Sequence, residues 1–310
     1  MSYWRTLRTR WRSRTLVLCY HRVTELPRDP FNCCVSPRNF AEHLDVLRAL
    51  DLVTPFAELI DIYQPRRLPG GRKVIITFDD GYADSLHSAA PLLARHGFHA
   101  MFYIFTGWIA GTEEAWWDRL ERVVNDAGTL QPPPRMAGVH GQFATTDRGS
   151  WFESLYLPLR DIAPTRREKI MATLDAASGR AAEVRPAYRP LTLAELRNLA
   201  GQPGVHIGAH TVTHPLLPSL PARQQQFEIA SSREWLEREL GQPVRDLAYP
   251  HGAESTATRS AAAVAGMKTA VTCEERTIRR ADNPLAIPRV LVYNWDGDEF
   301  ARRLAWWFTH

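Results

Sequence analysis

Short apolar segments recur along the chain, and most of them are followed by a stretch whose apolar residues have helical spacing. Continuous apolar runs rich in β-branched residues are typical of strands that are buried on both faces of a parallel sheet. Because strands and helices alternate, we expect a parallel sheet, and the number of strands favours a closed or nearly closed barrel over an open, doubly wound sheet. The predicted strands span residues 15–20, 73–78, 100–105, 205–208, 246–249, 268–272 and 287–292.

Helices are predicted between these strands from capping residues and from apolar positions that share one face. Ser36 has the side chain of an N-cap for a helix that runs to about Leu50, and Phe40, Leu44 and Leu47 fall on one side of that helix. Further helices are expected over residues 83–96, 193–199, 222–240 and 257–265.

The alternation breaks between about residues 107 and 190, a stretch that is too long for one βα unit. It contains a tryptophan pair at 116–117, a proline triplet at 132–134 and a helix candidate over 165–177. We interpret it as an insertion packed near the barrel mouth, within a single domain of residues 1–310. Its tryptophans could stack on sugar rings, although burial in a core is the commoner use of any one of them.

Charge adds one feature to this picture. The net charge of +4 is mild, and its excess lies in an N-terminal arm, residues 1–14, that holds five arginines and no acid. Trp4 and Trp11 lie among the arginines, so the arm could contact an anionic membrane surface; a solvated tail that leads into the first strand is the alternative. No pattern indicates a nucleic-acid partner, and none predicts an oligomeric state.

The cysteines and the first apolar run bear on the compartment. The run at 15–20 is too short for the apolar region of a signal peptide or for a membrane span. The chain has four cysteines without metal-site spacing, and the adjacent pair Cys33 and Cys34 is a poor basis for a disulfide framework. We therefore expect a cytoplasmic protein, with membrane association through the basic arm as an option.

Two adjacent acids, Asp79 and Asp80, follow the apolar strand 73–78, and Gly81 allows the backbone to turn sharply after them. Adjacent carboxylates repel each other, and a metal ion on one of them keeps both ionised and leaves the other free as a base. An Asp-Asp-Gly triplet is also compatible with an ordinary turn or helix cap. The pair therefore becomes a candidate site only if ligands lie nearby.

His210 and His214 follow the strand 205–208, and a spacing of four residues puts their side chains on one face of a helical turn. Functional residues gather at the C-terminal ends of barrel strands, so these histidines and the acids are expected on one rim. Two histidines, one carboxylate and an open position suit zinc, and the same ligands also serve non-haem iron. We favour hydrolysis, because an iron oxygenase would leave Asp79 without a task.

Three motifs together carry a resemblance. Residues 77–81, 210–215 and 248–252 read Thr-Phe-Asp-Asp-Gly, His-Thr-Val-Thr-His-Pro and Ala-Tyr-Pro-His-Gly. In this order they resemble the first three motifs of the polysaccharide deacetylase family, also called the NodB-homology or carbohydrate esterase family four. The resemblance extends in rhythm over most of the chain, apart from the arm and the insertion.

The resemblance implies a distorted (β/α)7 barrel that holds a divalent metal, with zinc as the first choice. In the family's terms Asp79 is the catalytic base, and the metal ligands are Asp80, His210 and His214. The chemistry agrees with these roles, because amide hydrolysis at neutral pH needs an activated water, charge stabilisation at the carbonyl oxygen and a proton for the departing amine.

The third motif is expected to form the substrate and oxyanion site through Tyr249, Pro250 and His251. As in the family, a backbone N–H of the turn at 250–252 would hold the oxyanion. His251 stands where the family frequently has an aromatic residue, so we expect it to line the cleft without a chemical role.

The chain departs from the family at the general acid. The family usually takes this acid from a late Leu-x-His motif, but residues 287–290 read Ile-Pro-Arg-Val here. A branch of the family that opens with a Tyr-His strand looks similar, and this resemblance implies His21 as the acid, on the side of the site opposite Asp79. The alternative is a histidine that only bonds a loop backbone.

A second departure concerns the partner of the base. The family often has an arginine two residues before the proline of its third motif, where this chain has Ala248. Arg289, in the last predicted strand, could replace it by pairing with Asp79 and keeping that acid ionised. The alternative is a surface arginine beside a proline.

Together these features predict a metal-dependent hydrolase that removes acetyl groups from N-acetylated sugars of a glycan or a lipid-linked glycan intermediate. The expected cytoplasmic location favours a precursor over a finished extracellular polymer. Three alternatives stay open: an O-deacetylase of sugar esters, a carbohydrate-binding barrel with weak or no turnover, and a hydrolase of small non-sugar amides.

Overall fold

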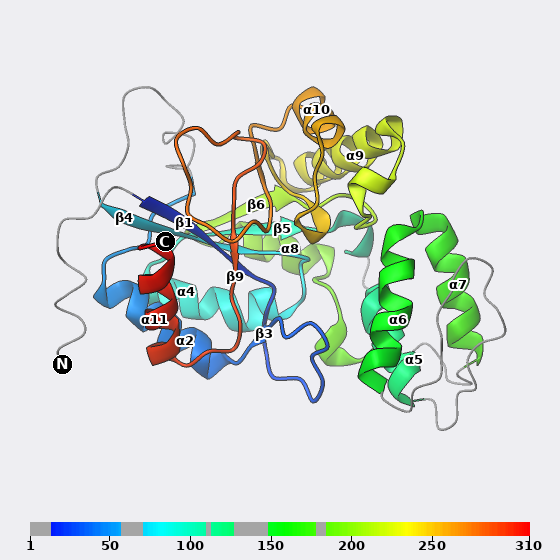
Figure 1. Ribbon diagram of the computed structural model, residues 1–310, viewed down its shortest axis with the longest axis horizontal. Helices are drawn as coiled ribbons and strands as arrows, with labels where there is room; N and C mark the ends of the chain where they lie inside the picture. Colours follow the sequence, from blue (N-terminus) through cyan, green and yellow to red (C-terminus); the bar gives the residue numbers. More distant parts are fainter. Residues whose placement is uncertain (1–13, 57–70, 110–112, 127–147, 178–183) are drawn as a thin grey trace.

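A sheet of seven parallel strands, in the order β8-β7-β6-β5-β4-β1-β9, forms the centre of the molecule (Figure 1). All seven predicted segments contribute a strand, so the expected parallel sheet is confirmed. The strands are β1 (Arg14–Tyr20), β4 (Arg72–Phe78), β5 (Ala100–Ile104), β6 (Val205–Ala209), β7 (Asp246–Ala248), β8 (Thr269–Val271) and β9 (Val290–Leu291). The computed structural model describes residues 14–56, 71–109, 113–126, 148–177 and 184–310.

The sheet curls until the segment before β9 reaches the far edge strand. Val271 of β8 is bridged in parallel to Ile287, while Leu18 of β1 pairs with Val290 of β9. The segment 287–291 therefore pairs with β8 on one side and with β1 on the other, and it brings the sheet round into a half-barrel. This is the distorted (β/α)7 barrel that the motifs led us to expect.

Alternate residues of the strands belong to two separate cores, because successive side chains of a strand point to opposite faces. Leu16 and Leu18 of β1 pack in the large core between the sheet and the helices. Val17 of β1 and Ile75 of β4 belong to a smaller core inside the barrel. Asp79, an even number of residues after Ile75, continues the interior row. Strand periodicity thus directs this carboxylate into the barrel.

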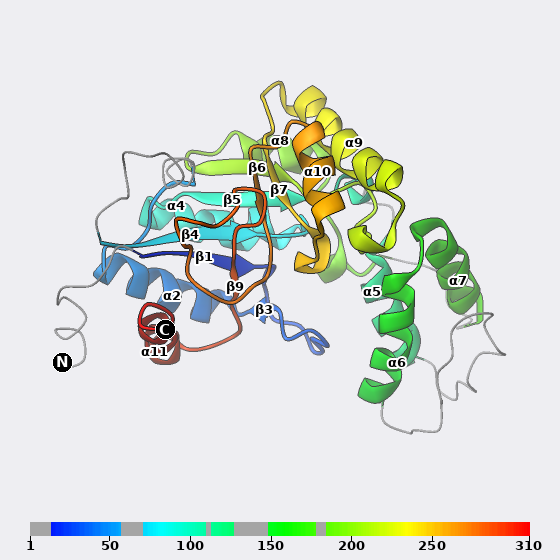
Figure 2. The same cartoon turned by 45° about the horizontal axis from the view of Figure 1, so that its top comes forward.

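Helices cover the outer face of the curled sheet, so in Figure 2 α2 and α11 appear below it and α8, α9 and α10 above it. Their bounds are α2 (Pro37–Ala49), α4 (Ala90–His96), α8 (Leu193–Ala200), α9 (Ala222–Leu240), α10 (Thr256–Val264) and α11 (Gly297–Trp307). The sequence analysis did not predict α11. The predicted cap of α2 is confirmed, because Ser36 Oγ accepts a hydrogen bond from the Asn39 N–H at 3.1 Å.

The helix predicted over 83–96 is divided in two. A π-helical turn (Ser85–Ala89) precedes α4. Pro91 supplies the physical reason, because proline has no N–H for the carbonyl four residues earlier and its ring clashes with that carbonyl in a regular α-helix.

The insertion contains three helices that group together on the right of Figures 1 and 2: α5 (Trp116–Asp126), α6 (Arg148–Asp161) and α7 (Pro164–Ala177). The predicted helix at 165–177 is confirmed as α7. Trp116 and Trp117 are buried in a core that these helices share with Tyr82 and Phe105 of the barrel. The proline triplet and residues 1–13 of the basic arm lie outside the described residues.

Short elements complete the fold. A parallel pair, β2 (Arg22–Val23) and β3 (Cys34–Val35), was not predicted and brackets the loop 24–33. Single 3₁₀ turns are formed by Thr106–Trp108, Pro186–Tyr188, Leu217–Ser219 and Pro250–Gly252. Within the described ranges, no helix combines the length and the apolar composition that crossing a membrane requires.

A buried histidine joins α2 to the segment that leads into α11. His43 Nε2 donates to the Trp295 carbonyl at 2.7 Å, and its Nδ1 lies 3.2 Å from the Tyr20 hydroxyl. The imidazole stacks on Phe300 of α11 with ring centroids 4.1 Å apart. Burial lowers the pKa of His43 to about 4, although the Trp295 carbonyl opposes this shift.

We expect acid to destabilise the fold through His43. Because the folded pKa lies below the unfolded value of about 6.5, the unfolded chain binds the proton first, and stability falls as pH drops from about 6.5 towards 4. His43→Gln, which stays neutral, should remove on the order of 2 kcal/mol of this pH dependence. Urea unfolding of both proteins at pH 7 and pH 4.5 measures it, and parallel losses in the two proteins would contradict the assignment.

Candidate active site

The acids and the histidines emerge at the same rim, from two parallel strands, β4 and β6, that are separated by β5. Asp79 and Asp80 directly follow β4, and the Asp79 N–H still donates to the Tyr20 carbonyl at 3.0 Å. His210 directly follows β6 and its N–H donates to the Ile104 carbonyl at 2.9 Å. These bonds fix where each motif leaves the sheet.

The backbone is strained where the motifs turn. Among the described non-glycine residues, six have positive φ, and four of these lie at the site: Asp80, Thr211, His214 and His251. Left-handed conformations of such residues cost of order 1–3 kcal/mol each and cluster at functional sites. The strain marks this rim as a place where side-chain position matters more than backbone stability.

Asp80, His210 and His214 form a compact, buried cluster. Asp80 Oδ1 lies 3.5 Å from Nε2 of His210 and 3.5 Å from Nε2 of His214, and the ligand atoms of the three residues all lie within 4.8 Å of one another. His210 Nδ1 lies 2.8 Å from the Ala248 carbonyl, which can only accept. His210 therefore keeps a proton on Nδ1, and its Nε2 faces Asp80.

His214 is held in its neutral form. Burial lowers its pKa well below the usual value, and the neighbouring His251 and His210 add to the effect. A neutral imidazole is the form that binds metal ions. The cluster thus offers two imidazole nitrogens and a carboxylate, a donor set that could hold a divalent cation.

Asp79 and Arg289 form a buried, bidentate ion pair. Arg289 Nη1 donates to Asp79 Oδ1 at 2.7 Å, and Nη2 donates to Oδ2 at 2.6 Å. Nε of Arg289 donates to the Thr272 carbonyl at 2.9 Å, and the side chain is fully buried. The expected pairing is present, and the alternative of a surface arginine is wrong.

This pair sets the charge of Asp79. Burial by itself raises the pKa of the carboxyl, but Arg289 and then His210 outweigh burial and hold the pKa well below its usual range. Asp79 is therefore ionised at neutral pH, and its Oδ2 lies 4.0 Å from Nε2 of His210.

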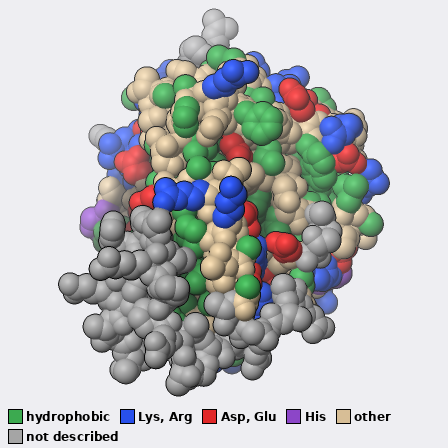
Figure 3. Space-filling model, turned by 90° about the vertical axis from the view of Figure 1, so that its right-hand side faces the viewer, with side chains coloured by type: hydrophobic (Ala, Val, Ile, Leu, Met, Phe, Trp, Pro, Cys, Tyr) green, Lys and Arg blue, Asp and Glu red, His purple; other side chains and the backbone are tan. Residues whose placement is uncertain are grey.

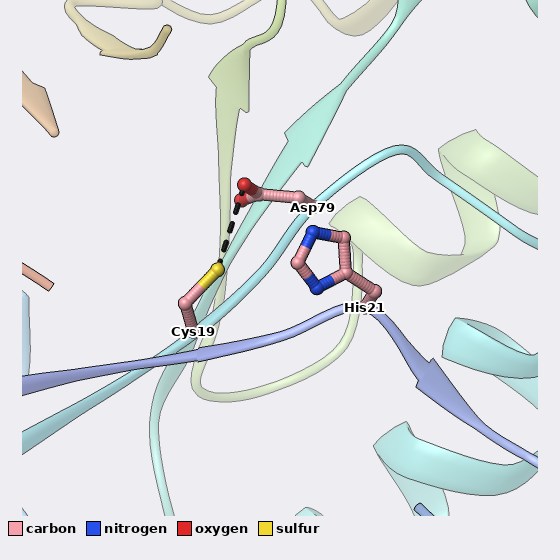
Figure 4. A group of neighbouring side chains, drawn as sticks. All are labelled: Cys19, His21 and Asp79. Atoms are coloured by element: carbon pink, nitrogen blue, oxygen red, sulfur yellow. Dashed lines mark hydrogen bonds between the residues drawn. The ribbon is translucent and has the colours of Figure 1, made fainter. Parts of the chain in front are cut away.

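His21 lies beside Asp79. The nitrogen, sulfur and oxygen atoms of His21, Cys19 and Asp79 lie within 4.8 Å of one another, and Figure 4 shows the three side chains converging. His21 is half-buried and lines the same cavity as Asp80. We expected His21 on the side of the site opposite Asp79, but the end of β1 places it next to the base, because β1 and β4 are paired neighbours.

The third motif contributes through one residue of its turn. Within the turn Pro250–Gly252, proline has no N–H and the Gly252 N–H donates to the Tyr249 carbonyl at 2.8 Å. The His251 N–H donates no hydrogen bond to any described residue, so it is the free donor of the turn. The His251 ring lies 4.7 Å from that of His214 and lines the cavity, as expected.

Tyr249 does not belong to this cavity, contrary to our expectation. Its hydroxyl donates to the Leu285 carbonyl at 2.9 Å, and its N–H donates to the Val271 carbonyl at 3.1 Å. Both polar groups of Tyr249 are therefore bonded to backbone carbonyls, and the ring packs in the core between the sheet and the helices. The strand alternation that points Ala248 into the barrel turns Tyr249 away from it.

A cavity of about 270 Å³ adjoins the cluster of Asp80, His210 and His214 and the neighbouring His21, and the insertion forms part of its wall. Trp117 packs its ring 4.8 Å from His214, and its indole N–H donates to the Tyr82 hydroxyl at 2.8 Å. That hydroxyl donates to Asp118 at 2.7 Å, and burial raises the pKa of Asp118 to about 7, although Arg22 opposes this shift.

Sequence reasoning missed this wall, although two signals were present. Tyr82 directly follows the Asp-Asp-Gly turn, and Trp117 belongs to the tryptophan pair of the insertion.

The face of the molecule seen in Figure 3 carries hydrophobic, basic and acidic side chains side by side on its described part, so no single sign of charge dominates there.

Comparison with known proteins identifies the family. A family model described as polysaccharide deacetylase matches residues 67–130 and 165–270. The chain belongs to the polysaccharide deacetylase family. The break in the match covers residues 131–164, which lie inside the insertion.

Relatives support the same family. A curated Bacillus subtilis protein, YxkH, whose name contains the words polysaccharide deacetylase, is 32% identical over 102 residues, which are 33% of this chain and 36% of that protein. The matched region thus spans about a third of the curated relative's length. The solved Streptococcus pyogenes deacetylase PplD superposes with a TM-score of 0.63 at 20% identity, covering 94% of this chain and 98% of that one.

A second solved structure, IcaB from Ammonifex degensii, gives a TM-score of 0.64 at 20% identity and covers 97% of this chain and 99% of that one. At such identities these likenesses establish the shared fold.

The ion pair makes a prediction about stability. Arg289→Met should lower the free energy of unfolding at pH 7 by about 3–5 kcal/mol, because it leaves the Asp79 charge buried without a partner. The double variant Asp79→Asn with Arg289→Met should recover most of this loss, since no buried charge remains. Urea unfolding of the wild type, both single variants and the double variant measures the coupling. Additive losses would show that the two side chains do not depend on each other.

Proposed function

We propose that the protein is a metal-dependent deacetylase that removes acetyl groups from N-acetylated sugars of a glycan or a lipid-linked glycan intermediate. One observation carries the proposal: the buried Asp79–Arg289 pair lies directly beside the cluster of Asp80, His210 and His214. The pair supplies an ionised acid in a fixed position, and the cluster supplies a set of ligands. Membership in the polysaccharide deacetylase family supports the same class of reaction.

The cluster of Asp80, His210 and His214 fits a divalent ion of the zinc type. Its donors are two imidazoles and one carboxylate, and the hydrogen bond from His210 Nδ1 to Ala248 is the outer contact that orients a ligating histidine. When bound, such an ion supplies polarisation of the acetyl carbonyl and a water of lowered pKa. Iron(II) shares these ligands, and we propose zinc because hydrolysis needs no change of redox state.

Asp79 is the proposed base that takes a proton from the attacking water. Arg289 acts as a positioning residue, because its two hydrogen bonds prevent the carboxylate from rotating. The same pairing favours the ionised carboxylate, so Asp79 releases an acquired proton readily. His21, within 4.8 Å, is the neighbouring group that can accept this proton and deliver it to the departing amine. We therefore propose that His21 is the general acid, acting from the side of the base.

Negative charge that develops on the carbonyl oxygen needs a hydrogen-bond donor. We propose the His251 N–H for this role, because it is the free donor of the third motif. The substrate ring would lie in the adjoining cavity, where Trp117, Tyr156 and Tyr188 supply aromatic faces that suit the apolar faces of sugar rings.

The cytoplasmic location and the contact of the basic arm with a membrane surface stay predictions. The proposal of a lipid-linked precursor as the substrate depends on the cytoplasmic location.

Asp79→Asn is the direct test of the base. We expect the rate of acetate release from an N-acetylhexosamine oligomer to fall by about 100-fold or more, with metal content unchanged, because the amide cannot accept the proton. Asp246→Asn is the matched control, since Asp246 begins β7 at the end of the barrel away from the site. A chelator should abolish release by the wild type, and added zinc should restore it. Equal rates for wild type and Asp79→Asn would refute the base assignment.

His21→Gln separates N- from O-deacetylation. An amine leaves with difficulty unless it is protonated, whereas an ester oxygen depends less on an acid. We expect the variant to lose about 100-fold in acetate release from the N-acetylated oligomer and less than about tenfold from an acetylated xylan. Acetate release by both proteins from both substrates measures this. A wild type that cleaves only the xylan would establish the O-deacetylase instead, and equal losses on both substrates would remove His21 from the acid role.

A further inference from the structure

Two cysteines flank the Asp79–Arg289 pair, and the proposed hydrolysis uses neither. Cys19, on β1, is fully buried, with Sγ 3.6 Å from Asp79 Oδ2. Cys273 follows β8, and its Sγ lies 3.9 Å from Arg289 Nη2. Cys19 thus contacts the carboxylate of the pair, and Cys273 contacts the guanidinium.

Cys273 can be reached from the cavity. It is only partly buried, and it lines the same cavity as His21, Asp80 and His214. On its other side it packs against the turn that carries the His251 N–H. A Cβ placed on Gly252 would lie 2.6 Å from Cys273 Cβ and 2.9 Å from its Sγ, so no room exists between them. Any atom added to the Cys273 sulfur must enter the cavity or displace this turn or Arg289.

The surroundings of Cys273 favour its thiolate. Hydrogen bonding with Cys19 lowers the pKa of Cys273 to about 6; burial opposes this shift, and the charge of Arg289 adds to it. Burial instead raises the pKa of Cys19 well above its usual value, so Cys19 keeps its proton and serves as the donor. A thiolate that is reachable and lies beside a guanidinium is the environment of a reactive cysteine.

We propose that Cys273 is a modification site for small peroxides, and that oxidation of its sulfur inactivates the neighbouring site. The Cys273 thiolate attacks one oxygen of hydrogen peroxide. An S–O bond forms, the O–O bond breaks and hydroxide leaves, so the products are a sulfenic acid at Cys273 and one hydroxide. Sulfur supplies the electron pair, and the peroxide is the oxidant.

The added oxygen would act on the ion pair. It lies within reach of Arg289 Nη2, the same group that donates to Asp79 Oδ2. A new acceptor there competes with Asp79 for Arg289 and presses on the turn that carries His251. Oxidation would therefore remove both the fixed position of the base and that of the oxyanion donor.

Cys33 provides a control inside the same cavity. It is also partly buried and lines the cavity, but its Sγ lies 3.7 Å from the Asp29 carboxylate. Hydrogen bonding with Cys34, burial and the Asp29 charge raise the pKa of Cys33 well above its usual value. Cys33 and Cys273 thus both line the cavity, and they differ in the charge beside the sulfur.

Labelling of the wild-type protein tests the modification. Purified protein is treated with dilute hydrogen peroxide and a reagent that traps sulfenic acids, and peptide mass spectrometry follows each cysteine. We expect Cys273 to be labelled at least about tenfold faster than Cys33. Cys19→Ala should slow the labelling of Cys273, because the hydrogen-bond donor is lost. Equal rates at the two cysteines, or faster labelling of Cys33, would overturn the proposal.

Inactivation rests on the proposed function and is measured separately. Acetate release is followed after peroxide treatment of the wild type, Cys273→Ser and Cys33→Ser, each relative to its own untreated rate. We expect the wild type and Cys33→Ser to lose activity together, while Cys273→Ser is protected. Loss of activity by Cys273→Ser at the wild-type rate would overturn the link to the site. A protein without acetate release would contradict the deacetylase proposal alone, since the labelling rates still decide the modification.

Discussion

The buried ion pair between Asp79 and Arg289 is the interaction on which the rest of the site depends. An isolated carboxylate is costly inside a barrel, and a guanidinium that meets both of its oxygens makes the charge tolerable there. Because Arg289 also bonds the Thr272 carbonyl, the pair ties β4 to the segments on either side of the barrel closure. The interaction that keeps Asp79 ionised therefore also holds the last strand segment against the first ones.

The curled sheet explains why these groups meet. Parallel strands end at one rim, and side chains alternate between the barrel interior and the helix side. Asp79 and Arg289 thus point inward together, while Tyr249 turns out to the helices. The motif residues at the rim adopt left-handed conformations, a strain that the packed barrel beneath them can bear.

The insertion and the loop 24–33 give this common barrel its individual cavity. Trp117 packs on His214 and is held by Tyr82, so a helix of the insertion touches the proposed metal cluster. The loop carries Cys33 to the same cavity. The barrel thus supplies the reactive groups, and the insertion and the loop 24–33 shape the cavity beside them.

The seven strands and the grouping of Asp79, Asp80, His210 and His214 could be predicted from the sequence, because runs of apolar residues and short motifs are local signals. The sequence also pointed to Arg289 as a partner for Asp79. The folded structure was needed to show that His21 lies beside Asp79, that Tyr249 lies outside the cavity and that Cys19 and Cys273 flank the ion pair. Asp79 and Arg289 are 210 residues apart, and the contacts around them depend on how the sheet curls and closes. That closure is a sum of many weak packing contacts, and no local pattern in the chain encodes it.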